Sequence, residues 1–173
     1  MGPNRLLFEE LFLPYLDGAY NLARWLVETD QDAQTVVRDA YIQAWAQFGE
    51  FRGTDARLWL LTIVRNMATD RIQTHRSHST TISFQKSNDV VSSDQASLDP
   101  SQEQRKQELR RALSRLPFEF REILALRDIE GWSYGQLASA LNLPTPAVVS
   151  RLTEARSRLR QAMVGVQPPG LRE

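Results

Sequence analysis

A helix-turn-helix pattern across residues 131–160 is the feature that most constrains the fold of this chain. Ser133 and Gln136 have the spacing of a capping box, which predicts the start of a helix. The expected apolar face of that helix consists of Leu137, Ala138 and Leu141. Residues 142–144, Asn-Leu-Pro, are typical of a helix stop. The pattern therefore predicts one short helix followed by a tight turn.

A second, longer helix is expected after the turn. Thr145 can cap it, and Pro146 occupies an early position where a missing backbone N–H costs nothing. The residues expected to point inward are Val148, Leu152, Ala155 and Leu159. Its other faces carry Ser150, Arg151, Arg156, Arg158 and Arg160. A short helix, a turn and a cationic second helix form an arrangement that a DNA major groove accepts. The alternative is an ordinary helical hairpin with a solvated basic face.

The charge distribution favours the DNA-binding interpretation. The net charge of the 173 residues is zero, yet residues 101–173 carry twelve Lys/Arg against eight Asp/Glu. Residues 1–76 carry eight against ten. Positive charge therefore gathers where the helix-turn-helix pattern lies, although overall neutrality predicts modest DNA affinity for the isolated chain.

Composition excludes several other classes. The chain has no cysteine, which excludes disulfides, thiolate metal sites and thiol catalysis. No apolar run approaches the roughly eighteen residues of a membrane span. We therefore expect a cytoplasmic protein without a membrane segment.

Residues 1–76 are typical of amphipathic helices and show no useful strand alternation. An early helical pair is expected to kink near Pro14, and Thr29 or Asp30 can cap the next helix. The inward positions of the pair are Leu7, Leu11, Leu16, Tyr20, Ala23 and Val27. The next helix repeats Val36, Val37, Ala40, Tyr41, Ala44, Trp45 and Phe48. In a third helix, the spacing of Trp59 with Ile63 and Met67 favours core packing over stacking on a base.

Residues 77–100 differ from the blocks on either side. They contain seven serines and two threonines with almost no periodicity, so we predict a flexible linker. Residues 101–163 predict about four further helices, and residues 164–173 a disordered tail. The inward positions expected before the helix-turn-helix are Leu109, Ala112, Leu113, Leu116, Phe120, Ile123, Leu124 and Leu126. The predicted fold class is all-α: two small helical domains joined by a flexible linker, the C-terminal one containing the helix-turn-helix.

The sequence contains no catalytic constellation. His75 and His78 are the only histidines, and a solvated helix end is favoured over a metal site for this pair. A Gly-rich phosphate loop is also missing. We therefore expect neither an enzyme nor a cofactor.

Both helical blocks resemble one family, the bacterial sigma-70-type initiation factors, and specifically their extracytoplasmic-function (ECF) group. In the first block the resemblance rests on Phe51-Arg52-Gly53, Trp59-Leu60, Ile63-Val64-Arg65-Asn66 and Asp70-Arg71. In the second it rests on Leu116-Pro117, Glu130-Gly131-Trp132-Ser133-Tyr134, Leu137-Ala138, Leu143-Pro144, Ser150-Arg151-Leu152 and Ala155-Arg156. Two blocks in this order, with a polar linker between them, make the resemblance specific.

The resemblance implies a role for each block. Residues 1–76 would dock on the clamp of core RNA polymerase and melt the minus-10 promoter element. Asn66 aligns with the family asparagine that contacts an extruded base, and an amide supplies both donors and an acceptor. Contacts to the DNA backbone are expected from Arg52, Arg57, Arg65 and Arg71. The clamp contacts are expected from Asp32, Asp39, Tyr41, Gln43 and Trp45.

Residues 101–163 would read the minus-35 element. The expected DNA-facing residues are Val149, Ser150, Arg151, Thr153, Glu154 and Arg156. Family members usually have a basic residue at the position of Val149, and often at that of Glu154. Because valine can contact a thymine methyl but cannot pair with guanine, we infer an unusual minus-35 sequence or weak minus-35 dependence.

The expected partners are core RNA polymerase, promoter DNA and an anti-sigma protein. Two alternatives remain open. One is a sigma-like decoy or adaptor that binds an anti-sigma protein without reading DNA. The other is a conventional helix-turn-helix transcription regulator.

Overall fold

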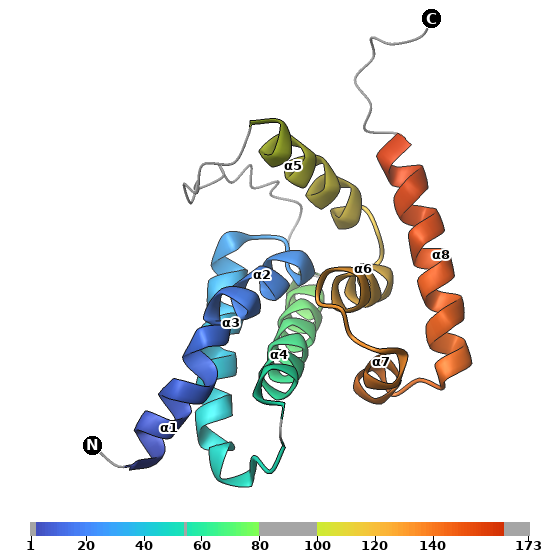
Figure 1. Cartoon of the computed structure of the whole chain (residues 1–173). Helices are drawn as coiled ribbons and strands as arrows, with labels where there is room; N and C mark the ends of the chain where they lie inside the picture. The colour runs from blue at the N-terminus through green and yellow to red at the C-terminus, as the bar shows by residue number, and fades with distance from the viewer. Residues whose placement is uncertain (1–2, 54, 80–99, 165–173) are drawn as a thin grey trace, which may run out of the picture. The chain divides into compact units, whose positions relative to one another are not determined.

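The computed structural model describes residues 3–53, 55–79 and 100–164, and every regular element in these ranges is helical (Figure 1). The all-α class is therefore confirmed. The chain divides into two compact units, Met1–Asn88 and Asp89–Glu173. Within the described ranges, no helix combines the length and apolar character needed to cross a bilayer.

Unit 1 is built around three helices that pack on one another, α2, α3 and α4 (Figure 1). Its elements in chain order are α1 (Pro3–Phe12), the 3-10 turn η1 (Leu13–Tyr15), α2 (Leu16–Leu26), α3 (Asp30–Ala46), the 3-10 turn η2 (Phe48–Glu50) and α4 (Ala56–Ser79). The expected kink near Pro14 is present as η1. Thr29, one of the two expected caps, is the N-cap of α3, and its hydroxyl accepts from the backbone N–H of Asp32 at 3.0 Å.

The inward face predicted for the first two helices is partly wrong. Leu7 and Leu16 are 49% and 43% exposed, whereas Phe8 and Phe12 are buried. The core positions of α2 are Ala19, Leu22, Ala23 and Leu26. In α1 the buried face runs through Phe8 and Phe12, one residue after the predicted Leu7 and Leu11, and Leu16 directly follows the 3-10 turn, outside the buried face of α2.

An aromatic cluster fills the end of unit 1 where α1, α4 and the segment after α3 meet. The ring of Phe12, which is fully buried, lies 5.3 Å from Trp59 and 5.7 Å from Phe51, centroid to centroid. Phe8 makes edge contacts with Trp45 and Phe48 at 5.2 Å and 5.4 Å. Trp59 is half-buried and packs against the core through Phe12, in the direction that its spacing predicts.

Unit 2 contains α5 (Pro100–Ser114), α6 (Phe118–Leu124), the π-helical turn η3 (Ala125–Ile129), α7 (Tyr134–Leu141) and α8 (Thr145–Val164). Most of the predicted inward positions are confirmed as buried: Ala112, Leu113, Leu116, Phe120, Ile123, Leu124, Leu126, Leu137, Val148, Leu152 and Ala155. The π-turn was not predicted. In it the N–H of Glu130 donates to the carbonyl of Ala125 at 3.0 Å, five residues back.

The boundaries of the linker differ slightly from expectation. α4 continues to Ser79, and α5 already begins at Pro100. The remainder of the predicted linker, residues 80–99, lies outside the described residues, as does the tail from residue 165 onward.

The buried ring of Phe12 gives a direct test of this packing. Phe12→Ala should lower the free energy of unfolding of unit 1 by about 3–5 kcal/mol, because it opens a cavity among rings that cannot close together. Urea unfolding followed by tryptophan fluorescence measures this, since Trp25, Trp45 and Trp59 lie in unit 1. Leu13→Ala, at a half-exposed neighbouring position, is the control and should cost about 0.5 kcal/mol or less. Equal losses for the two variants would contradict the packing.

Candidate nucleic-acid interface

The helix-turn-helix begins with the predicted capping box. The Ser133 hydroxyl accepts from the backbone N–H of Gln136 at 3.2 Å, and the Gln136 side chain accepts from the backbone N–H of Ser133 at 2.8 Å. Both free N–H groups at the start of α7 are thereby satisfied, which fixes where the helix begins.

The turn that follows depends on a left-handed residue. Asn142 has φ 52° and ψ 48°, a conformation that asparagine adopts more readily than most residues. The N–H of Leu143 then donates to the carbonyl of Ala138 at 3.0 Å, which closes the end of α7. This turn changes the direction of the chain within three residues and leads directly into α8, which runs across the direction of α7 (Figure 1).

α8 begins one residue earlier than predicted. The N–H of Val148 donates to the carbonyl of Pro144 at 3.1 Å, so Thr145 is the first helical residue and not its cap. Pro146 lies in the first turn, where its missing N–H leaves no hydrogen bond unmade. The correction moves the start of the helix by one residue and leaves the faces of α8 as predicted.

Two opposite faces of α8 are clearly distinguished. Val148, Leu152 and Ala155 are buried against the rest of unit 2. The exposed residues on the opposite side include Pro146, Val149, Ser150 and Thr153. Arg151, between the two faces, is half-buried. Three of the residues predicted to face the minus-35 element, Val149, Ser150 and Thr153, are therefore brought together on one exposed surface.

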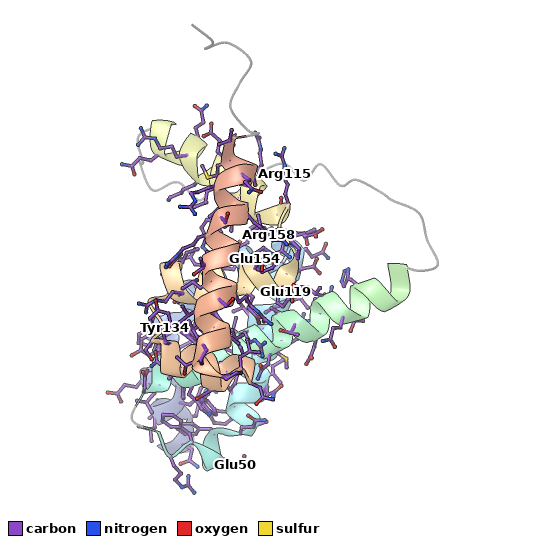
Figure 2. The ribbon with its side chains drawn as sticks, turned by 90° about the vertical axis from the view of Figure 1, so that its right-hand side faces the viewer. Glu50, Arg115, Glu119, Tyr134, Glu154 and Arg158 are labelled. Atoms are coloured by element: carbon purple, nitrogen blue, oxygen red, sulfur yellow. The ribbon has the colours of Figure 1, made fainter. Side chains whose placement is uncertain are left out.

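Glu154 and Arg156, the two remaining residues of the six predicted to face the minus-35 element, make ion pairs within unit 2. Arg156 forms two hydrogen bonds with Asp128 of η3, at 3.1 Å and 2.5 Å, and these raise the pKa of Arg156. Glu154 accepts from Arg158 one turn later at 2.6 Å, and both side chains can be followed on α8 in Figure 2. The guanidinium of Arg158 also lies over the Phe120 ring, 4.6 Å from its centre.

The predicted minus-10 residues are spread over several faces of unit 1. Asn66 is exposed on α4, and its side-chain oxygen accepts from Arg65 at 3.1 Å, so these two lie together. Arg57 stands nine residues earlier. At about 100° per residue this is half a turn away, on the opposite side of the helix. Arg57 and Asn66 therefore do not share one face.

Arg71 and Asp32 were expected to contact different partners, but they contact each other. The Nε of Arg71 donates to the Asp32 carboxylate at 2.8 Å, and the His75 ring nitrogen lies 3.5 Å from the same oxygen. The Asp32 side chain is only 14% exposed. This pair joins the start of α3 to the second half of α4.

The pKa of Asp32 reflects these contacts. Burial by itself raises this pKa, but hydrogen bonds from Thr29 and Arg71 and the charges of His75 and Arg71 outweigh burial. The result is a pKa below the ordinary value of 3.8.

Arg52 lies in the loop between η2 and α4. Its guanidinium donates to the carbonyls of Gly49 at 2.6 Å and Phe51 at 3.1 Å, which holds the loop in shape. Beside the loop is an open pocket of about 440 Å³ whose lining residues are Asn4, Leu7, Leu11, Phe48, Gly49, Phe51, Arg52 and Gly53. The sequence did not predict this pocket, because its walls come from α1 and from a loop some forty residues later.

The residues predicted to meet the polymerase clamp are only partly on the surface. The Tyr41 hydroxyl donates to the carbonyl of Phe12 at 2.8 Å, and burial, with the negative charge of Asp17, raises the pKa of Tyr41 to about 12. Gln43 is half-buried, and Asp39 is half-exposed beside Arg38. Trp45 is 46% exposed, although one face of its ring contacts Phe8.

The outer face of α3 carries an exposed apolar residue that was not predicted. Ile42 is 62% exposed and lies one helical turn from both Arg38 and Trp45. An isoleucine in the middle of an apolar repeat is normally assigned to the core. The usable signal was that Ile42 falls out of phase with Val36, Ala40 and Ala44.

Among the side chains that the structure describes, no group of three or more His, Asp and Glu is placed to hold a metal ion. His75 instead faces Asp32.

The comparisons agree for both units. The family profile described as Sigma-70 region 2 matches residues 11–78, and that described as Sigma-70, region 4 matches residues 106–159. The ECF RNA polymerase sigma factor SigM of Mycobacterium tuberculosis is 31% identical over 164 residues, which cover 92% of this chain and 79% of that protein. The RNA polymerase sigma-H factor of Pseudomonas aeruginosa is 28% identical over 168 residues, covering 90% and 86%.

A solved structure shows the same likeness. The sigma factor RpoE from Bartonella quintana, in complex with the anti-sigma factor NepR, matches with a TM-score of 0.75 and 26% identity, covering 93% of this chain and 98% of that one. The chain therefore belongs to the sigma-70 family, in the ECF group of RNA polymerase sigma factors, and functions in transcription initiation.

The Asp32–Arg71 pair predicts a pH-dependent contribution to stability. Because the folded pKa of Asp32 is lowered, its contribution is present at neutral pH and disappears as the pH falls through that pKa, below about 4. Asp32→Asn should lower the free energy of unfolding by about 1 kcal/mol at pH 7, since the pair is partly exposed, and by less at pH 3. Urea unfolding at both pH values measures this. Asp39→Asn, on the exposed side of α3, is the control, and a loss that is independent of pH would contradict the assignment.

Proposed function

We propose that the two units read two promoter elements for core RNA polymerase. Unit 1 docks on the polymerase clamp and melts the minus-10 element, while unit 2 reads the minus-35 element through α8. The observation that carries this proposal is the exposed amide of Asn66 on the rigid helix α4, in a chain whose other unit holds a helix-turn-helix. The chain itself catalyses no reaction and acts in the cytoplasm.

Melting without an energy source requires that bases be captured as they leave the stack. Asn66 offers hydrogen bonds to a base edge, and the Arg65 guanidinium, which donates to the Asn66 side-chain oxygen, brings a positive charge next to this amide. The pocket beside Arg52 supplies apolar walls from Leu7 and Phe51 against which an unstacked base can lie. Arg71 acts instead within the fold, through Asp32.

For clamp docking, we propose the outer face of α3 around Arg38, Ile42 and Trp45. These side chains are exposed, whereas Asp32 and Tyr41 of the predicted set make their hydrogen bonds inside unit 1. Asp39 and Gln43 border this face. An exposed isoleucine and tryptophan next to a cation fit the composition of a protein–protein interface.

An anti-sigma protein is the expected regulator. The matched sigma factor RpoE was solved in complex with the anti-sigma factor NepR. We propose that this chain is likewise held inactive by a protein of that class.

One observation favours a decoy over a promoter reader. Arg156 and Arg158, two cations of the second helix, are paired with Asp128 and Glu154 and so are less available to phosphate. A decoy would bind an anti-sigma protein yet never direct transcription. Run-off transcription with core RNA polymerase and a promoter library distinguishes the two. A promoter reader gives discrete transcripts, whereas the absence of specific initiation would contradict the proposal.

Asn66→Ala tests the minus-10 assignment. It should lower open-complex formation about tenfold or more while leaving binding to core polymerase near normal, because the amide acts on DNA. Thr74→Ala is the control, at an exposed position farther along α4 whose hydroxyl bonds only its own helix, to the carbonyl of Asp70. Open complexes are counted by heparin-resistant filter binding, and polymerase binding by fluorescence anisotropy. Equal losses in both assays would mean that Asn66 is structural.

Asp128→Asn tests whether the η3 contact withholds a cation from DNA. Releasing Arg156 should raise the affinity of the holoenzyme for promoter DNA several-fold and steepen the slope of log affinity against log salt by about 1, the effect of one added phosphate contact. The matched control is Glu119→Gln, which removes one negative charge from an exposed position on α6 (Figure 2). If both variants change the slope alike, the effect comes from net charge and not from Arg156.

A further inference from the structure

The exposed side of α8 carries a narrow row of side chains that present apolar carbon groups to the solvent. Pro146, Val149 and Thr153 are three and four residues apart, a spacing that places them along one face of the helix. All three are exposed, and Val149 is 45% exposed. These three residues are called the α8 ridge below. The ridge lies beside the buried face of α8, which is formed by Val148, Leu152 and Ala155.

The hydrogen bonding of Thr153 adds to the apolar character of the ridge. Its hydroxyl donates to the backbone carbonyl of Val149 at 2.9 Å, one turn back in the same helix. The donor is therefore used inside α8, and the methyl group remains for contact with a partner. Pro146 has a side chain made only of carbon and no backbone N–H. All three positions thus present carbon.

Arg156 is the arginine that lies next to the ridge, three residues after Thr153. Recognition of guanine in the major groove relies chiefly on an Arg or Lys that donates two hydrogen bonds to its O6 and N7. Arg156 already gives two hydrogen bonds to Asp128. Arg151 is two residues from both Val149 and Thr153, so at about 100° per residue it lies on the other side of α8. No arginine next to the ridge is therefore oriented for guanine.

From this geometry we infer that the α8 ridge recognises thymine methyl groups, so that the minus-35 element of this protein has A·T pairs where the ridge enters the groove. The thymine methyl is the apolar group that base pairs present in the major groove. Ser150, exposed next to the ridge, can add one hydrogen bond to a neighbouring base edge. The inference rests on the proposed role of unit 2 as the minus-35 reader and names the sequence class that it reads.

DNA is favoured over a protein as the partner of the ridge for two reasons. The ridge lies in the first half of the second helix of a helix-turn-helix, the part that contacts base edges when such a motif binds DNA. The C-terminal 73 residues carry an excess of positive charge, twelve Lys/Arg against eight Asp/Glu, which suits phosphate. A row of three small side chains also falls well short of the apolar patch that a stable protein interface buries.

Deoxyuridine gives a selective test, because it differs from thymidine only by lacking the methyl group. A promoter is first selected from a library with a random minus-35 region, using the holoenzyme with the full chain. Each thymine of the selected element is then replaced by deoxyuridine, and promoter binding is measured. We expect a loss of about fourfold at each contacted methyl, corresponding to one buried carbon group.

Two variants assign the effect to the ridge. Val149→Ala shortens the ridge and keeps a good helix former, so it should abolish the response to deoxyuridine at one position. Ser150→Ala is the matched control and should retain that response. Circular dichroism of both variants establishes that they fold.

Three outcomes would overturn the inference. One is initiation that is indifferent to deoxyuridine throughout the minus-35 element. Another is a selected element with guanine at the positions sensitive to Val149→Ala. The third is normal promoter choice by Val149→Asp, which would assign the ridge to a protein partner. The absence of initiation from every library member is a different result, because it contradicts the proposed function itself.

Discussion

The left-handed turn at Asn142 is the constraint on which the DNA-reading surface depends. It ends α7 and changes the direction of the chain before Pro144. It thereby determines which face of α8 packs against the rest of unit 2. Because Val148 and Leu152 are buried, Val149 and Thr153 lie on the exposed side of α8. The capping box at Ser133 fixes the other end of α7, so the motif is held by local hydrogen bonds at both ends.

Several arginines of both units are paired with carboxylates of the protein itself. Arg71 and Arg156, two arginines that DNA could have used, bond carboxylates of their own unit, and Arg158 pairs with its helical neighbour Glu154. This use of cations agrees with the zero net charge of the chain. Because Arg71 and Arg156 are paired within the protein, the proposed promoter contacts gain less from phosphate neutralisation by these two side chains.

The sequence predicted what local spacing determines. The capping box, the stop at Asn142 and most of the inward positions of unit 2 follow from patterns within one or two helical turns. The prediction that Leu7 and Leu16 lie inside was wrong, because the aromatic side chains Phe8 and Phe12 form the buried face of α1, and Leu16 directly follows the 3-10 turn, outside the buried face of α2. The contacts of Arg71 with Asp32 and of Arg156 with Asp128 join residues 39 and 28 positions apart, and no periodicity reveals such pairs. The site residues from sequence are consequently a mixture of exposed candidates and members of internal ion pairs.

Permanganate footprinting of a promoter bound by the holoenzyme is the decisive measurement for a two-element promoter reader, because permanganate oxidises thymines that have left the stack. Such a reader gives two results on one DNA molecule. Thymines of the minus-10 element become reactive, and the minus-35 element is protected from nuclease by unit 2. Protection of a single duplex site without reactive thymines, or binding that does not require core polymerase, would contradict it and would identify a conventional helix-turn-helix regulator instead.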